Sequence, residues 1–442
     1  MPWTIVLTNT VAFALCFAVW VVFGPSVRII AKELHLTLAA ATFVKTVPIL
    51  VGSVTRVPIG MLTDRFGPRL MMPSVMATAG AAVVYLSGAH DLANLIGGAA
   101  VMGLCGSSFA VGVASVSSWT PANKKGAALG FFGAGNVGTA ITTFCLPMLL
   151  ASLGWRGAFR TYGLTLMAAG GAYALLGRNA PVKGLHPSLS VILKPLASLR
   201  TWRFGLYYVA TFGVFVALTL TLSDIYVDAY KLSLVKAGLL STIFTFTASI
   251  ARIPGGGLAD RWGARRVLQL AFGAAILSLT PICFGMPMAA TVVAGFLAGI
   301  ALGVGMAAVF RYIPDYFPAN VGAVGGLVGA LGGLGGFFLP QVSALVKVQT
   351  GSVFLSVSPL VAAIAAALIL QYFAIGWAIA ASAQPKTESA DLGRLSDALD
   401  LAGKGLPGEP LPDPSRTKQD QTADGSTKRN PGASRDKGEK DV

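Results

Sequence analysis

Two arginines lie inside strongly apolar stretches, at the same place in each half of the chain. The stretch Thr55–Arg69 matches the stretch Ala251–Arg265 at eight of fifteen positions, and Arg56 and Arg252 are among the matches. Matching residues are always 196 positions apart. A tandem repeat of this length predicts two similar halves that each contribute one arginine to a shared place in the fold.

The composition is that of a membrane protein. Of 442 residues, 54% are hydrophobic and 12% are charged, whereas a soluble protein carries about 25% charged residues. A helix that spans a bilayer needs about 20 apolar residues, and the sequence contains twelve such runs. They cover approximately residues 4–27, 41–62, 70–89, 93–116, 127–151, 157–177, 205–224, 237–258, 267–286, 290–312, 321–346 and 353–378. We therefore expect an all-α membrane protein with twelve transmembrane helices in two pseudo-symmetric six-helix halves.

The repeat and the breaks in hydropathy predict four regions. They are a six-helix half at 1–178, a basic, proline-containing cytoplasmic linker at 179–203, a second six-helix half at 204–383, and a tail at 384–442. The tail is rich in Gly, Pro, Asp and Lys and nearly free of aromatic residues, so it cannot bury enough apolar surface to fold. We expect it to be disordered.

The formal charge of +15 could suit a nucleic-acid-binding protein, but the distribution of charge excludes that class. The tail holds 10 of the 33 basic and 11 of the 18 acidic residues, which leaves 23 basic and 7 acidic residues in the membrane portion. Most of these basic residues cluster in short loops on one side. The positive-inside rule then predicts a multi-pass protein of the cytoplasmic (inner) membrane, with both termini cytoplasmic and lipid as its surroundings. The first apolar run has no basic region before it and no clear cleavage site, so no cleavable signal peptide is expected.

Arg56 and Arg252 are predicted to lie near the middle of the membrane. Arg56 precedes Asp64 by eight residues, or about 12 Å along a helix, and half the hydrocarbon thickness is about 15 Å. A buried ion pair is one possible reason for such an arginine, but the seven acids of the membrane portion lie near predicted helix ends. These acids are Glu33, Asp64, Asp91, Asp224, Asp228, Asp260 and Asp315. The other reason is an anion, since planar guanidinium groups suit a planar oxyanion.

The pattern Gly-x-x-x-Asp-Arg-x-Gly-x-Arg occurs at Gly60–Arg69 and again at Gly256–Arg265. It resembles the loop signature of the major facilitator superfamily, where it acts as a cytoplasmic gating latch; an ordinary solvated loop is the alternative. The resemblance implies conformational roles for two sets of residues. They are Gly60, Asp64, Arg65, Gly67 and Arg69, and Gly256, Asp260, Arg261, Gly263 and Arg265.

Two glycine-rich runs, Ala134–Ala140 and Gly329–Pro340, are similar to the paired signatures of the NarK-type nitrate/nitrite porter family. Small residues let transmembrane helices approach closely, and that explanation covers most of the glycines. Those singled out are Gly133, Gly135, Gly138, Gly329, Gly332 and Gly333. Asn136 differs from its equivalent, Gly332, and its amide can donate to an anion near the arginines.

The resemblance implies that Arg56 and Arg252 bind the anion, and that aromatic residues sandwich it. By local match these are Phe109, Tyr208 and Phe212, which without the resemblance would be read as packing residues. The implied function is a secondary active transporter of nitrate, and of nitrite, that works by alternating access with proton-coupled uptake. Nitrate/nitrite exchange, a carrier of oxalate or formate, and a non-transporting sensor remain as alternatives.

An enzyme is not expected, because no catalytic triad, metal cluster or phosphate loop occurs in the sequence. The four cysteines and three histidines lack metal-ligand spacing, so we expect no metal and no cofactor. The protein is expected to be a monomer.

Overall fold

The computed structural model describes residues 3–121, 125–179, 197–317 and 321–383. Within these ranges the chain consists of helices joined by short connections and contains no strand. Residues Met1–Trp377 belong to one compact unit. The tail at 384–442 and most of the expected linker lie outside the described residues. The following helix, α11, begins at Leu199, inside the stretch expected as linker.

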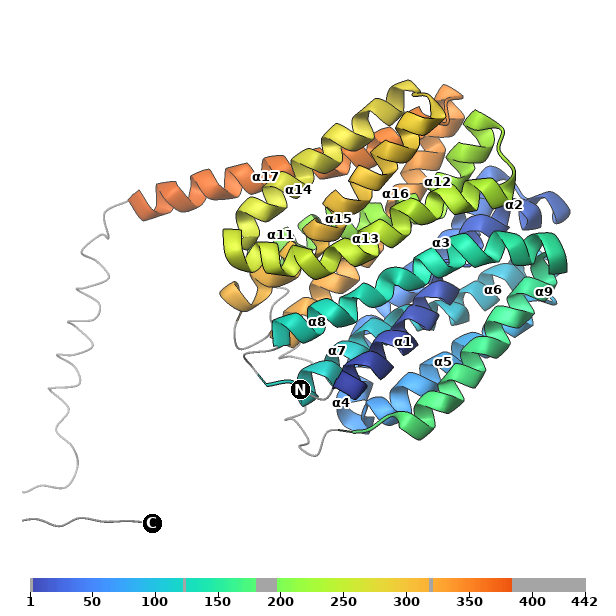
Figure 1. Cartoon of the computed structure of the whole chain (residues 1–442), viewed down its shortest axis with the longest axis horizontal. Coiled ribbons are helices and arrows are strands. Elements are labelled where there is room, and N and C mark those ends of the chain that lie inside the picture. The colour runs from blue at the N-terminus through green and yellow to red at the C-terminus, as the bar shows by residue number, and fades with distance from the viewer. Residues whose placement is uncertain (1–2, 122–124, 180–196, 318–320, 384–442) are drawn as a thin grey trace, which may run out of the picture. The chain divides into compact units, whose positions relative to one another are not determined.

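The helices of the first half are α1 (Trp3–Trp20), α2 (Phe23–Glu33), α3 (Leu38–Val54), α4 (Arg56–Phe66), α5 (Pro68–Leu86), α6 (Leu92–Met102), η1 (Gly103–Ser107), α7 (Ser108–Trp119), α8 (Lys125–Gly133), η3 (Ala134–Val137) and α9 (Gly138–Leu176). Those of the second half are α11 (Leu199–Tyr208), the π-helical turn η5 (Val209–Gly213), α12 (Val214–Tyr230), α13 (Leu234–Trp262), α14 (Ala264–Leu279), η6 (Thr280–Phe284), α15 (Met288–Tyr316), α16 (Val321–Thr350), η7 (Leu355–Val357) and α17 (Ser358–Ala383). Figure 1 shows these helices side by side in a bundle.

The described residues contain ten helices that are long and apolar enough to cross a membrane, or eleven if α3 and α4 count as one bent span. One of the ten, Ala128–Leu176, is 49 residues long, more than twice the length of a single span. Gly154 interrupts it with non-helical angles, φ 65° and ψ 175°, between the spans expected at 127–151 and 157–177. The expected count of twelve therefore requires that this helix be divided at Gly154.

The sequence repeat is also present in the backbone. His35 and Lys231, which are 196 residues apart, are the two non-glycine residues with positive φ in the described chain, at 52° and 56°. Gly67 and Gly263 have φ values of 82° and 85° at the matching loops. Equivalent hydroxyl residues, Thr37 and Ser233, accept hydrogen bonds from the backbone at the starts of α3 and α13. The two halves therefore share local conformation as well as sequence.

One expected helix is bent next to Arg56. The run 41–62 was expected to be continuous, but α3 and α4 meet at Thr55 with a bend of 45°. Pro58 lacks an N–H and its ring crowds the carbonyl four residues earlier, which kinks a helix. The Thr55 hydroxyl adds bonds to the Val51 carbonyl and to Ser107, each at 2.7 Å. In the second half, α13 contains the equivalent Pro254 and continues without interruption.

The two halves meet mainly through two helix pairs, α3 with α16 and α9 with α13. The ends of α4 and α13 that carry Asp64 and Asp260 lie at one end of the bundle, which we call the motif end. The connections from α2 to α3 and from α12 to α13 lie at the other end, which we call the Arg28 end. The two arginines lie between these ends, where α3/α4 and α13 cross the contact between the halves.

Candidate functional site

Each buried arginine lies against the equivalent glycine of the other half. A Cβ added to Gly329 would lie 3.3 Å from Arg56 Nη1, and one added to Gly133 would lie 3.2 Å from Arg252 Nη2. Gly133 and Gly329 are 196 residues apart, as are the arginines. The arginines are 2% and 5% exposed. Thus the two contacts between the halves repeat one another, and in both an added Cβ would force the arginine to shift by a few tenths of an ångström.

Arg56 uses only part of its hydrogen-bonding capacity. Its Nε donates to the Gly106 carbonyl at 3.2 Å, and its Nη1 donates to the Gly329 carbonyl of the other half. Its Nη2 is buried and has no partner. A buried donor of a charged group that lacks a partner is costly, so this atom is a natural contact for an anion.

Arg252 has a weaker partner. Its Nη1 lies 3.8 Å from the Met306 sulfur, and a thioether is a poor acceptor. In the described part of the chain, no carboxylate pairs with either arginine. The buried ion pair that could have explained these arginines is therefore not found among those residues. Arg252 also opposes the charge of Arg56 by Coulombic repulsion.

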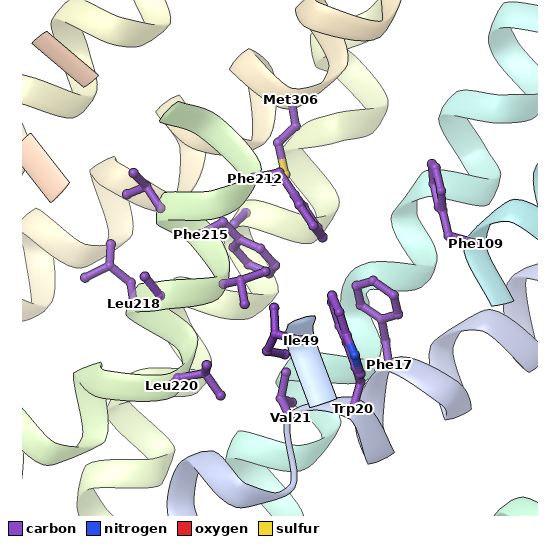
Figure 2. Close-up of a cluster of buried hydrophobic side chains, with 14 of the residues drawn as sticks. Phe17, Trp20, Val21, Ile49, Phe109, Phe212, Phe215, Leu218, Leu220 and Met306 are labelled. Atoms are coloured by element: carbon purple, nitrogen blue, oxygen red, sulfur yellow. The ribbon is translucent and has the colours of Figure 1, made fainter. Parts of the chain in front are cut away.

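Three aromatic rings surround the Arg56 guanidinium. Its central carbon lies 5.6 Å from the Trp20 ring centre, 5.3 Å from that of Phe109 and 5.4 Å from that of Phe212. Rings at this distance attract a cation through their π-faces. Trp20 and Phe212 are nearly parallel, 17° apart, and Figure 2 shows both in one buried cluster. Phe109 and Phe212, singled out from the sequence, thus contact the same arginine.

Tyr208 forms a second layer behind Phe212. The two rings are stacked at 5.0 Å and 6°, and Tyr208 also meets Phe310 edge to face at 5.0 Å. Phe310 in turn contacts Phe109 from the first half at 5.9 Å. Tyr207 lies against Phe272 instead. Of the two adjacent tyrosines, Tyr208 is therefore the one that joins the aromatic layer around Arg56.

Asn136 is buried without a hydrogen-bonding partner. It is 1% exposed, and neither its side-chain oxygen nor its side-chain nitrogen has a partner. It lies in η3, three residues after the Gly133 that touches Arg252, and η3 contacts α13. Buried amides nearly always have partners, so Asn136 is a second buried donor group without a protein acceptor, one helical turn from the contact of Gly133 with Arg252.

The six singled-out glycines fall into two groups. Gly135 and Gly138 approach α1 within their own half, where added Cβ atoms would lie 2.4 Å from Phe13 Cδ1 and 1.8 Å from the Ala14 carbonyl oxygen. The other four face the site. Besides Gly133 and Gly329, these are Gly332, which lies against the Tyr208 ring, and Gly333, which lies against the Ser53 hydroxyl. The first group serves packing, and the second makes room for the arginines and the aromatic layer.

The two repeated loops hold their charged residues away from the arginines. In the second half, Arg311 Nε pairs with Asp260 Oδ1 at 2.5 Å, which links α15 to the end of α13. In the first half, Arg65 lies over the Phe66 ring and the Arg69 amide donates to Asn179 at 3.0 Å. Gly67 and Gly263 supply the positive φ that each turn requires. At the motif end, the pair of Asp260 with Arg311 thus ties α13 to α15.

Sequence reasoning missed several residues at the site. Trp20, Met306 and Phe310 are ordinary members of apolar runs, and nothing in their spacing distinguishes them from core residues. The Gly106 and Gly329 carbonyls are backbone groups with no side-chain signal. Trp20 is fixed by an indole N–H bond to the Pro48 carbonyl at 2.7 Å and by its contact with Gly52 and Gly106.

A family model and a solved structure match this chain over most of its length. The family model of the Major Facilitator Superfamily matches residues 10–340 and 204–395. A solved structure of a bacterial homolog to the human lysosomal transporter Spinster superimposes with a TM-score of 0.63, covering 85% of this chain and 96% of that one. The two are 15% identical, so this likeness concerns the fold alone.

Three relatives are closer in sequence. A probable nitrate/nitrite antiporter NarK1 of Thermus thermophilus is 38% identical and covers 78% of this chain and 85% of its own length. A nitrite extrusion protein of Bacillus subtilis is 33% identical, and the match covers 76% of this chain and 85% of that protein. A probable nitrate transporter NarT of Staphylococcus epidermidis is 29% identical, and the match covers 78% of this chain and 89% of that protein.

Proposed function

The chain belongs to the NarK-type nitrate/nitrite porter family of the major facilitator superfamily, and from that premise we propose that it carries nitrate and nitrite across the cytoplasmic membrane by alternating access. The anion is held between Arg56 and Arg252. Asn136 donates to it, and Phe109, Phe212 and Tyr208 form the aromatic walls. The names of the relatives support this class of substrate.

One observation carries the proposal: two equivalent buried arginines lie at the contact between the halves, each against a glycine of the other half. The unpartnered Arg56 Nη2 and the Asn136 amide add donors. The oxygens of a small planar monoanion can accept hydrogen bonds from these donors, which have no acceptor in the protein. Three rings lie within 5.6 Å of the Arg56 guanidinium carbon, so we expect the smallest oxyanions to be favoured over larger carboxylates such as oxalate.

The charge of the site suggests how transport is coupled. Two arginines without carboxylate partners among the described residues give an empty site of charge about +2, which is costly in a medium of low dielectric. One bound monoanion halves that charge. An empty carrier would therefore reorient slowly, and exchange of nitrate for nitrite needs no other ion. Proton-coupled uptake, the mode expected from the sequence, needs in addition a group or water chain that carries the proton.

In this proposal, the motif end faces the cytoplasm and the Arg28 end faces outward, in accord with the loop charges. The repeated loops then act as latches at the cytoplasmic end, about 12 Å from the arginines along each helix. The halves rock about the site, so that each end opens in turn.

Counterflow in proteoliposomes tests the proposal. Labelled nitrate should accumulate in vesicles loaded with nitrate or nitrite and should not accumulate in vesicles loaded with the larger oxalate. An imposed inward proton gradient with no internal anion separates the two modes, because only the proton-coupled carrier would concentrate nitrate. Failure of nitrate and nitrite to exchange in either direction, with correctly folded protein, would exclude this function.

A further inference from the structure

Five charged side chains form a cluster at the Arg28 end. Arg28 Nε donates to Asp224 Oδ1 at 2.6 Å, and its Nη2 pairs with Asp228. Lys45 Nζ pairs with Asp224 Oδ2 at 3.2 Å, and Lys347 Nζ pairs with Asp228 Oδ2 at 2.6 Å. Each carboxylate thus holds two cations. We call these five residues the charge cluster.

The charges of the cluster are divided unequally between the halves. Arg28 on α2 and Lys45 on α3 belong to the first half, whereas Asp224 and Asp228 on α12 and Lys347 on α16 belong to the second. Three of the four ion pairs therefore cross between the halves. If the halves part at this end, the carboxylates leave with the second half, and Arg28 and Lys45 lose their partners.

The cluster lies on the way from this end to the buried arginines. Lys45 precedes Arg56 by eleven residues, or at most about 16 Å along the helix. Between them, Ile49 and Ser53 lie against Gly336 and Gly333 of α16. The same end is closed by apolar contact as well, since a Cβ added to Gly24 of α2 would lie 3.5 Å from the Leu220 Cα of α12.

Lys45 makes this end costly to open. Its side chain is 6% exposed, and a buried cation that loses its carboxylate is strongly destabilising unless another anion takes its place. Arg28 and Lys45 share the Asp224 carboxylate, one oxygen each. An oxyanion offers the same oxygens, so it can replace the carboxylate on the same two cations.

We propose that the charge cluster is the outer gate of the transport path, and that Arg28 and Lys45 receive the incoming oxyanion when Asp224 and Asp228 withdraw. Arrival of the anion then compensates for the broken pairs and favours opening. The inference rests on alternating access, but the gate itself is tested without any substrate.

A buried cysteine probe tests the gate. Ile49 is fully buried between the cluster and the arginines, so an Ile49→Cys variant should react slowly with a membrane-impermeant thiol reagent applied from outside. Adding Asp224→Asn or Asp228→Asn should raise the labelling rate about tenfold or more, because weaker pairing increases the outward-open population. The same chains without Ile49→Cys supply the background from the native cysteines.

The chain offers a matched control. Glu33 and Arg156 form an ion pair at the same end, but both belong to the first half. Glu33→Gln removes a carboxylate pair without touching the contact between the halves, so it should leave labelling unchanged. If Glu33→Gln raises the labelling rate of Ile49→Cys as much as the aspartate variants do, or if the aspartate variants do not raise it, the charge cluster is not a gate.

A disulfide gives a second test that does not depend on removing charges. Gly24→Cys with Leu220→Cys should form a bridge that holds this end closed, since the two positions are in contact. Exchange should stop on oxidation and return on reduction, and each single variant should keep working when oxidised. Full exchange with the bridge formed would contradict an outer gate here.

The receiving role of the cations is tested by two variants that break the same ion pair from opposite sides. Lys45→Gln and Asp224→Asn should both speed labelling of Ile49→Cys, but only Lys45→Gln should raise the KM for external nitrate, by about fivefold or more. Lys45→Arg should restore it. An equal change of KM in both variants would refute this role. Absence of nitrate uptake by the wild type would instead contradict the proposed substrate, while the labelling result would stand.

Discussion

Arg28 and Asp224 are equivalent residues of the two halves, 196 positions apart, and their side chains pair directly, Nε to Oδ1 at 2.6 Å. Equivalent residues can meet in this way only near the axis that relates the halves. Arg56 and Arg252 are equivalent too, and they repel each other. Opposite charges therefore hold the halves together at one level. Like charges lie at the next level, where we propose that the anion binds.

Breaking the ion pair at the motif end should change turnover more than affinity. Asp260 and Arg311 are 64% and 37% exposed, and surface ion pairs contribute only about 0–1 kcal/mol to stability. Asp260→Asn and Arg311→Gln should therefore fold normally, yet alter the rate of nitrate exchange alike by shifting the balance of conformations. The comparison is exchange in liposomes against nitrate binding in detergent for the same variants.

Two results would count against a latch in that comparison. If Asp260→Asn abolishes nitrate binding while the protein remains folded, the loop contacts the substrate site. If Asp260→Asn and Arg311→Gln have opposite effects on the rate, the ion pair is not the element that both substitutions disturb.

Replacing Asn136 should keep or raise the stability of the protein but weaken its binding of nitrate. Its amide is buried without a partner, so replacing it with the similarly sized Leu removes a desolvation cost of about 1–3 kcal/mol. Asn136→Leu should unfold at the same or a higher temperature without nitrate. Asn136→Ala should weaken nitrate binding by about 1–3 kcal/mol, if the amide donates to a charged ligand. A destabilised Asn136→Leu protein with normal nitrate affinity would make Asn136 a structural residue.

The contact between Arg252 and Gly133 can be tested with one methyl group. An added Cβ would lie 3.2 Å from the guanidinium, so Gly133→Ala should displace Arg252 by a few tenths of an ångström. We expect nitrate affinity to fall about tenfold, or about 1.4 kcal/mol. Gly130, one turn earlier on α8, has nothing within 4 Å of an added Cβ. Gly130→Ala should therefore bind nitrate like the wild type. Equal nitrate affinity of the two variants would show that Gly133 does not contribute to the anion site.

The repeat made much of the fold predictable. Its constant spacing connected Arg56 with Arg252, and the motif that contains Asp64 with the motif that contains Asp260, without any structural information. The α-helical architecture followed from apolar runs of spanning length. The aromatic and asparagine assignments depended on family resemblance, because a ring in an apolar run carries no local signal of its role. The structure brings Phe109 and Phe212 to Arg56, but their contact with an anion remains a prediction.

Other features depend on tertiary contacts that spacing does not encode. At the bend, the Thr55 hydroxyl bonds to the Ser107 hydroxyl of another helix, a contact that the local sequence does not encode. The equivalent Pro254 lies in a continuous helix, so the proline alone does not predict the bend. The charge cluster was not anticipated because Asp224 and Asp228 were seen only as acids near a helix end. Their partners on α2, α3 and α16 become neighbours only when the halves meet.

The central claim is that Arg56 and Arg252 bind the transported anion, and the most direct test is nitrate binding to purified Arg56→Lys and Arg252→Lys proteins. Lysine keeps the charge but lacks the planar fork, so each variant should retain its helical content and lose about 100-fold or more in nitrate affinity, or about 3 kcal/mol. Exchange in liposomes should be nearly abolished in both. If either folded variant binds and exchanges nitrate like the wild type, the arginine pair is not the anion site.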